Sequence, residues 1–232
     1  MLYIFLWLLG SITLISILSA SARYLGKEIF PALLAGSLVT AIFVAGKLGD
    51  VTLSGIWTAA ISASIIVYSM TFLLTDTMSE LYWKDFTRRA IIGTALCYPI
   101  VYITTQLSIN WEPSQFYTTQ EGFASIMGMA GRITLASICS FSVSQLFDVW
   151  AFDKIKEKTK GKYLWLRNNW STMWSQLIDT VMFYSIAFIG ILPTEVLVNL
   201  IIVTYIFKLF IALLDTPFVY LVTNFIRSGD KK

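Results

Sequence analysis

Charged and amide side chains within otherwise apolar segments are the residues of this sequence whose types and spacing could do chemistry. A charge inside a bilayer costs about 2.5–3.5 kcal/mol on insertion scales, so residues of this kind mark a functional site or pair with one another. We therefore predict a substrate-binding role for eight of them: Asp76, Arg132, Gln145, Asp148, Gln176, Asp179, Lys208 and Asp215. For the four deepest charges, Arg132, Asp179, Lys208 and Asp215, purely structural ion pairs are the alternative. Asp76, Glu80 and Asp148 could instead be helix-end residues that reach headgroups or loop lysines.

The pattern Ser-Gln-Leu-x-Asp occurs twice, at residues 144–148 and 175–179. Gln and Asp three positions apart lie on one face of a helix. Since the two segments are expected to run in opposite directions, both pairs are predicted in the cytoplasmic half of the membrane, together with Asp76. A pattern with only three fixed polar positions is moderately specific, and a chance recurrence is the alternative.

Lys208 and Asp215 are seven residues apart, which puts them on one helix face but about 10 Å apart along its axis. Each must therefore reach another helix, water or a ligand. Arg132 points away from the face that carries Gln145 and Asp148, so we expect its counter-charge to come from Asp179 or Asp215. Pro217 can break the last helix locally and free backbone carbonyls beside a cavity.

Carboxylates and amides with aromatic neighbours suit the edge and the faces of a planar nitrogen heterocycle. The neighbouring aromatic residues are Tyr82, Trp83, Phe147, Trp150, Trp170, Trp174, Phe183 and Tyr184. The chain has no histidine, which excludes His-based triads and imidazole metal sites, and its two cysteines lie in apolar runs as free thiols. An aspartyl-type intramembrane enzyme is disfavoured because none of the intramembrane aspartates has an adjacent glycine. We expect no catalytic residue, metal or cofactor.

The elements that must position these residues are membrane helices. Of 232 residues, 56% are hydrophobic and 13% charged, about half the charge of a soluble chain, and the mean hydropathy is +0.71. Apolar runs long enough to cross a bilayer recur along the chain. We predict an all-α polytopic integral membrane helix bundle forming one domain, residues 1–232. It has about seven transmembrane helices, with six as the alternative, at residues 2–22, 29–46, 51–75, 90–109, 122–148, 171–191 and 195–226.

The basic residues predict an orientation through the positive-inside rule. Fourteen of the 17 Lys and Arg residues fall at 23–28, 80–89, 149–170 and the C-terminal tail, whereas the alternate loops contain only Lys47. This distribution predicts an outside N-terminus, a cytoplasmic C-terminus and an odd number of crossings. The lysine-rich segment 154–162 is interpreted as a solvated cytoplasmic loop that attracts anionic headgroups, not as a nucleic-acid site. The first segment lacks the preceding positive charge of a signal peptide and is predicted to be retained.

Several stretches within residues 70–220 resemble the vitamin uptake transporter family, whose members include the queuosine precursor transporters. The order and spacing of the intramembrane charges carry the resemblance. The stretches are Phe72–Glu80 with Arg88-Arg89, Arg132–Ser137 leading to Gln145–Phe152, Ser171-Thr172 through Asp179–Phe183, and Lys208 through Asp215 and Pro217.

The resemblance implies a multi-pass transporter of the cytoplasmic (inner) membrane that imports a 7-deazaguanine base, a precursor of queuosine in transfer RNA. It also implies about six crossings, one fewer than the charge distribution. The alternative function is the substrate-binding membrane subunit of an energy-coupling-factor importer, and a non-catalytic scaffold is a third. The expected partners are the small-molecule substrate and the lipid bilayer, without nucleic acid. A homodimer is compatible with this interpretation.

Overall fold

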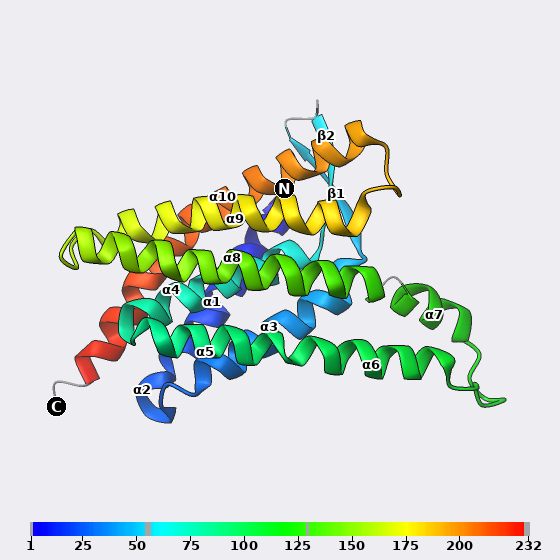
Figure 1. Ribbon diagram of the computed structural model, residues 1–232, viewed down its shortest axis with the longest axis horizontal. Helices are drawn as coiled ribbons and strands as arrows, with labels where there is room; N and C mark the ends of the chain where they lie inside the picture. Colours follow the sequence, from blue (N-terminus) through cyan, green and yellow to red (C-terminus); the bar gives the residue numbers. More distant parts are fainter. Residues whose placement is uncertain (1, 54–56, 129, 230–232) are drawn as a thin grey trace.

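The computed structural model describes residues 2–53, 57–128 and 130–229, and these residues form a bundle of helices with one small hairpin (Figure 1). Met1, Lys231 and Lys232, which bear on the predicted orientation, lie outside the described residues. The helices are α1 (Leu2–Ala20), α2 (Ala22–Leu25), α3 (Ile29–Ala45), α4 (Ser64–Leu81), α5 (Lys84–Ala95), α6 (Cys97–Asn110), α7 (Gln120–Gly128), α8 (Ala130–Lys158), α9 (Leu164–Phe188) and α10 (Thr194–Gly229). The predicted all-α class is confirmed.

A helix overlaps every predicted span, but the segment predicted as a helix over residues 51–75 is partly wrong. Strands β1 (Leu48–Leu53) and β2 (Trp57–Ser62) form an antiparallel hairpin there, with Leu48 paired to Ser62 and Leu53 to Trp57. β-branched and aromatic residues such as Val51, Thr52 and Trp57 favour a strand over a helix. Helix α4 therefore begins only at Ser64 and continues to Leu81, which places Asp76 inside the helix.

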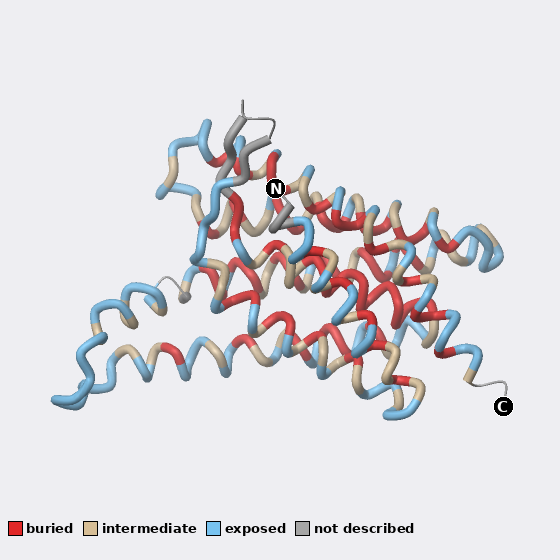
Figure 2. Tube along the Cα trace, turned by 180° about the vertical axis from the view of Figure 1, so that it is seen from behind, coloured by how far each residue is buried: buried red, intermediate tan, exposed pale blue. Residues whose placement is uncertain are grey.

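Four helical stretches among the described residues are long and apolar enough to cross a membrane, namely Phe5–Leu25, Lys84–Asn110, Gln120–Lys158 and Thr194–Gly229, and Ile29–Ala45 is a shorter apolar helix. Helices α4 and α9 do not meet that criterion because they carry many polar residues. These residues face the bundle interior: Thr75, Asp76, Gln176 and Asp179 are buried. The outer surface instead exposes large apolar side chains, such as those of Ile100, Leu107, Ile202, Leu213 and Leu221. Figure 2 shows the buried stretches of chain gathered in the middle of the bundle. An apolar exterior around a polar interior is the arrangement expected in a bilayer.

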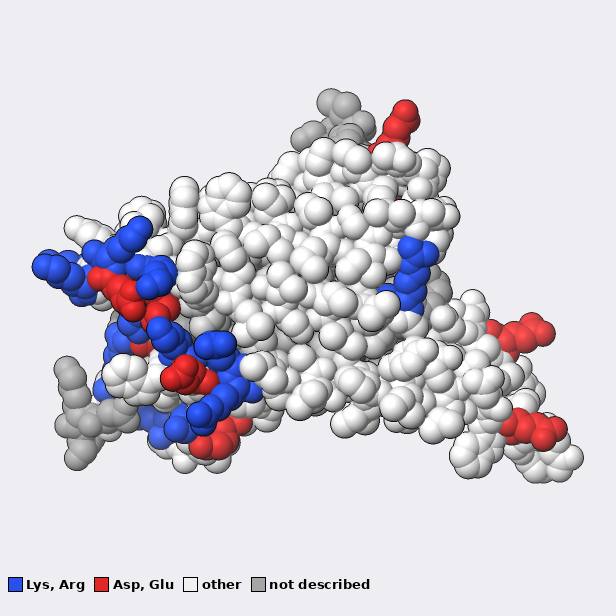
Figure 3. All heavy atoms as spheres, in the orientation of Figure 1, with Lys and Arg blue, Asp and Glu red and all other residues white. Residues whose placement is uncertain are grey.

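The predicted basic segments meet at one end of the bundle, the end at which α10 finishes (Figures 1 and 3). Arg23 of α2 donates hydrogen bonds to the Phe225 carbonyl and to Ser228 near the end of α10. Lys84 of α5 forms an ion pair with Asp153 of α8, 2.9 Å long. Segments far apart in the sequence thus share one end, as the charge distribution predicts. Residues 149–158 continue helix α8, so the predicted loop at 149–170 is shorter than expected.

Two long helices that carry candidate residues, α8 and α9, lie side by side and antiparallel along much of their length, and α10 packs against both α9 and α4 (Figure 1). Helix α10 continues through Pro217, so the predicted local break of this helix is wrong. The Thr216 hydroxyl donates to the Ala212 carbonyl at 3.0 Å in the turn that precedes the proline. These four helices bury seven of the eight candidate residues inside the bundle, and only Arg132 is exposed.

Candidate substrate site

The two Ser-Gln-Leu-x-Asp motifs contact each other reciprocally across the α8–α9 interface. Ser175 of α9 donates to Asp148 Oδ1 at 2.8 Å, and Ser144 of α8 donates to Asp179 Oδ1 at 3.4 Å. Because the helices are antiparallel, the serine at the start of each motif meets the aspartate at the end of the other. This pairing gives the repeated motif a structural role at the α8–α9 interface.

The reciprocal contact also separates the two aspartates into two layers. The residues of one motif's Ser–Asp pair are four positions apart, so the layers are about 6 Å apart along the helix axes. Asp179 lies toward the hairpin and Asp148 toward the basic end. The prediction that both Gln–Asp pairs lie in the cytoplasmic half of the membrane stays a prediction, and the register between the helices sets their two levels.

In the layer toward the hairpin, Asp179 accepts hydrogen bonds from three elements. Lys208 of α10 donates to Asp179 Oδ2 at 2.6 Å, and both side chains are buried. The Tyr68 hydroxyl of α4 donates to Asp179 Oδ1 at 2.5 Å. The Lys208 ammonium also lies 4.9 Å from the centre of the Tyr68 ring, a cation–π distance. Lys208 thus reaches another helix, as its distance from Asp215 requires.

A cavity adjoins this layer, and the space in it that is open to water-sized molecules is about 40 Å³. Its polar walls come from Ser62 and Ser64 near the hairpin, Ser137, Thr204, and the Asp179–Lys208 pair. Its aromatic walls are Tyr68, Tyr98, Phe183 and Tyr184. The cavity therefore combines one ion pair with several flat apolar surfaces.

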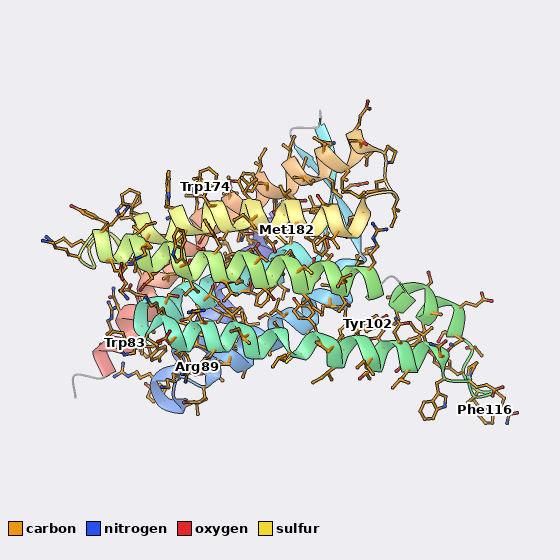
Figure 4. All side chains as sticks on the ribbon, viewed as in Figure 1. Trp83, Arg89, Tyr102, Phe116, Trp174 and Met182 are labelled. Carbon is orange, nitrogen blue, oxygen red and sulfur yellow. The ribbon has the colours of Figure 1, made fainter. Side chains whose placement is uncertain are left out.

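The aromatic residues predicted from the sequence lie mostly elsewhere. Phe183 and Tyr184 line the cavity, but Trp83, Trp150 and Trp174 are exposed on the outside of the bundle. Figure 4 shows Trp174 on the outer side of α9 and Trp83 at the basic end. Tyr68 was missed by the sequence reasoning. Its spacing of four and eight residues from Phe72 and Asp76 on one helix face could have indicated it.

The layer toward the basic end holds three buried acids. Asp76 Oδ2 accepts a hydrogen bond from the Thr172 hydroxyl at 3.1 Å, and Asp148 Oδ1 accepts one from the Ser175 hydroxyl, about one turn further along α9. Asp215 of α10 contacts the Asn168 side chain. Among the described residues, no Lys or Arg forms an ion pair with any of the three. They are not helix-end groups reaching headgroups, since each is at most 2% exposed.

Buried oxygen acceptors without a hydrogen-bond donor accumulate in and around this layer. They are Asp76 Oδ1, Asp148 Oδ2, Asp215 Oδ1, Asn168 Oδ1, Gln145 Oε1 and Gln176 Oε1. The amide nitrogen of Gln145 has a partner, since Nε2 donates to the Thr71 hydroxyl at 3.2 Å. Buried polar atoms usually have a hydrogen-bond partner, so this group of oxygens sets the region apart.

Arg132 does not meet a carboxylate. It lies exposed at the start of α8 and donates from Nε to the Ile186 carbonyl at 2.8 Å and from a guanidinium NH2 to the Ile189 carbonyl at 2.6 Å. A cation at the C-terminal end of α9 satisfies carbonyls that have no partner within the helix. The expectation that Asp179 or Asp215 supplies its counter-charge is wrong. Its role in binding substrate stays a prediction, as it is outside the residues that line the cavity.

At the basic end, Glu80 ties four helices together. It pairs with Arg167 of α9, which is 1% exposed, with Arg227 of α10 at 2.6 Å and with Lys156 of α8 at 3.5 Å. Arg167 also donates to the Gly161 and Lys162 carbonyls. Glu80 was expected to contact headgroups or loop lysines. It does contact a lysine, Lys156, but this residue belongs to helix α8 and not to a loop. The ion cluster draws α4, α8, α9 and α10 together at the end opposite the hairpin.

Comparison with known proteins covers the part of the chain that holds the site. The family model described as "Putative vitamin uptake transporter" matches residues 62–222, which include all eight predicted site residues. The "Probable queuosine precursor transporter" of Bacillus subtilis (strain 168) is 30% identical over 168 residues, 72% of this chain and 73% of that protein.

Two further relatives match over shorter stretches. The "Probable queuosine precursor transporter" of Haemophilus influenzae (strain ATCC 51907 / DSM 11121 / KW20 / Rd) is 27% identical over 64% of this chain and 62% of its own length. The "Queuosine precursor transporter" of Escherichia coli (strain K12) is 27% identical over half of each chain. No solved structure matches this chain. On the match over residues 62–222 and the similarity to the Bacillus protein, the chain belongs to the vitamin uptake transporter family.

Proposed function

We propose that this protein imports a queuosine precursor, a 7-deazaguanine base, across the cytoplasmic membrane. The names of three relatives support the substrate class. The apolar exterior and the long apolar helices support a multi-pass membrane protein. The expected partners are the base and the surrounding lipid.

The observation that carries the proposal is the buried Asp179–Lys208 pair beside a cavity with aromatic walls. A carboxylate can accept about four hydrogen bonds, and Asp179 accepts three, so one site is open. The Lys208 ammonium has three donors and uses one of them on Asp179. An open acceptor beside open donors matches the adjacent ring N–H and carbonyl oxygen of a guanine-like base.

The aromatic walls suit the faces of the same ligand. Planar rings gain from stacked or edge-to-face contacts with aromatic side chains, and Tyr184 and Phe188 already form such a stack beside the cavity. Tyr68, Tyr98 and Phe183 contribute further ring surface. A bare ion does not require several aromatic walls, whereas a flat heterocycle can contact both the ion pair and the rings.

The distribution of basic residues between the two ends of the bundle supports a direction of transport. By the positive-inside rule the basic end is cytoplasmic, with the N-terminus outside and the C-terminus inside. The cavity then lies on the outer side, near the hairpin, while the Glu80 ion cluster closes the inner side. An importer that waits for substrate has this arrangement, open outside and closed inside.

The test is uptake of radiolabelled 7-deazaguanine base by cells that lack their own transporter, with queuosine in transfer RNA as a second readout. Expression of the wild type should restore both signals, and Asp179→Asn should abolish them. Asp153→Asn is the matched control, because Asp153 pairs with Lys84 on the surface far from the cavity. No uptake by the wild type would refute the proposed substrate. Uptake by purified protein alone in liposomes would exclude the energy-coupling-factor alternative.

A further inference from the structure

The carboxyl groups of Asp76 and Asp148 meet the same turn of α9, although they come from different helices, α4 and α8. The Thr172 hydroxyl donates to Asp76 at 3.1 Å, and the Ser175 hydroxyl, three residues further along, donates to Asp148 at 2.8 Å. Both residues are fully buried, and Thr172 and Ser175 each donate one hydroxyl to the pair. Two carboxylates that share a site in this way cannot both ionise, so one of them keeps a proton.

The helices around the pair supply no compensating charge among the described residues. Helix α5 carries Lys84, which pairs with Asp153, and the exposed Arg88 and Arg89. Helix α10 supplies only a third acid, Asp215, and α9 supplies hydroxyls and amides at this level. The next charges along α4, α9 and α10 are already paired, with Glu80 engaged toward the basic end and Lys208 with Asp179 toward the cavity. Helices α1 and α3 contain no charged residue. Among the described residues no cation neutralises the pair.

A second observation concerns the oxygen atoms of the pair that the two hydroxyls do not reach. Oδ1 of Asp76 and Oδ2 of Asp148 are buried and have no donor. The side-chain carbonyl oxygen of Gln176 is also buried without a donor. Gln176 lies one helical turn along α9 from Thr172, the residue that donates to Asp76. Asn168, which contacts Asp215, also has a buried carbonyl oxygen without a donor. The described residues hold no cluster of His, Cys, Asp and Glu suited to a metal ion.

We propose that Asp76 and Asp148 share one proton, and that this carboxyl pair is the site through which a proton gradient drives transport. The sharing of the proton follows from the geometry of the pair, whereas the coupling to transport rests on the proposed function. The ligand of the site is the proton itself, and the net charge of the pair is −1 when it is bound and −2 when it is lost.

The position of the pair suits a coupling site. It lies about one helical turn from Asp179, which lines the outer cavity, since Ser144 contacts Asp179 and Asp148 is four residues further along α8. Asp76 is likewise one turn from Glu80, which closes the basic end. A proton can enter from the cavity side and leave on the cytoplasmic side once the Glu80 cluster opens. Its loss leaves two facing negative charges, whose repulsion favours separation of α4 from α8.

The proton can be detected without any substrate. Infrared spectroscopy of the purified full-length protein at neutral pH should show the carbonyl stretching band of a protonated carboxylic acid. The band should lose intensity in both Asp76→Asn and Asp148→Asn, while Asp215 can account for what remains. Glu157→Gln, on the exposed end of the same helix α8, is the matched control and should keep the full intensity. Absence of the band from the wild type, or unchanged intensity in both variants, would overturn the shared proton.

Coupling is measured in liposomes with radiolabelled base. A pH gradient, acidic outside, should drive accumulation by the wild type and by the control Glu157→Gln, but not by Asp148→Asn. Uptake that follows a sodium gradient and ignores pH would overturn the coupling. If no base is transported at all, the proposed function fails, but the infrared result still decides whether the pair holds a proton.

Discussion

Replacement of Lys208 by methionine tests the buried ion pair directly. Methionine keeps the length of the side chain but leaves Asp179 as a buried charge whose cationic partner is gone. Both side chains are almost fully buried and their charged atoms are 2.6 Å apart, so the loss of one partner should cost about 3–5 kcal/mol. For a chain of this size that corresponds to a fall in melting temperature of roughly 6–20 °C.

The double variant Asp179→Asn with Lys208→Met separates the ion pair from simple loss of packing. Replacing both charges removes the uncompensated carboxylate, and substitutions of whole buried pairs are often neutral. The double variant should therefore recover most of the lost stability. Thermal unfolding in detergent, followed by tryptophan fluorescence, gives the two melting temperatures. Lys154→Met is the control, because its pair with Glu157 is exposed and should contribute less than about 1 kcal/mol.

Two results would refute this reasoning. If Lys208→Met has the melting temperature of the wild type, Lys208 does not stabilise a buried, charged Asp179 carboxylate. If the double variant melts no higher than the single variant, the loss comes from packing of α10 and not from electrostatics.

Other changes have definite expected results. Glu80→Gln should lower the melting temperature much more than loss of an exposed ion pair does, because it leaves the buried Arg167 of α9 without its carboxylate. Equal melting temperatures of variant and wild type would argue against an ion cluster that closes this end. Ser175→Ala should cost about 1–3 kcal/mol and Ser144→Ala less, since their hydrogen bonds to aspartate are 2.8 and 3.4 Å long, and a reversed order by thermal unfolding would contradict the assigned contacts. In a cysteine-free background, Ser64→Cys should react with an impermeant maleimide from outside the cell and Lys158→Cys only from the cytoplasm; the opposite pattern would reverse the orientation.

The sequence by itself determined the class of protein, and it also determined that the basic segments lie at the same end of the bundle. Hydropathy and charge are properties of each stretch of chain, so apolar runs, the basic segments and the intramembrane acids can be identified without knowing the neighbours. The same reasoning failed over residues 51–62, where a hairpin replaces the predicted helix. There the local preference for β structure outweighed the apolar character that the prediction followed.

The tertiary structure alone decided which polar groups meet. Lys208 pairs with Asp179 and not with Asp215, Arg132 satisfies carbonyls of α9, and Asp76 faces Asp148. These contacts join residues between 29 and 72 positions apart in the chain, and each depends on the register and rotation of two packed helices. A shift of one residue rotates a side chain by about 100° around its helix. Sequence periodicity gives the face of one helix, but only packing fixes which face of another helix it meets.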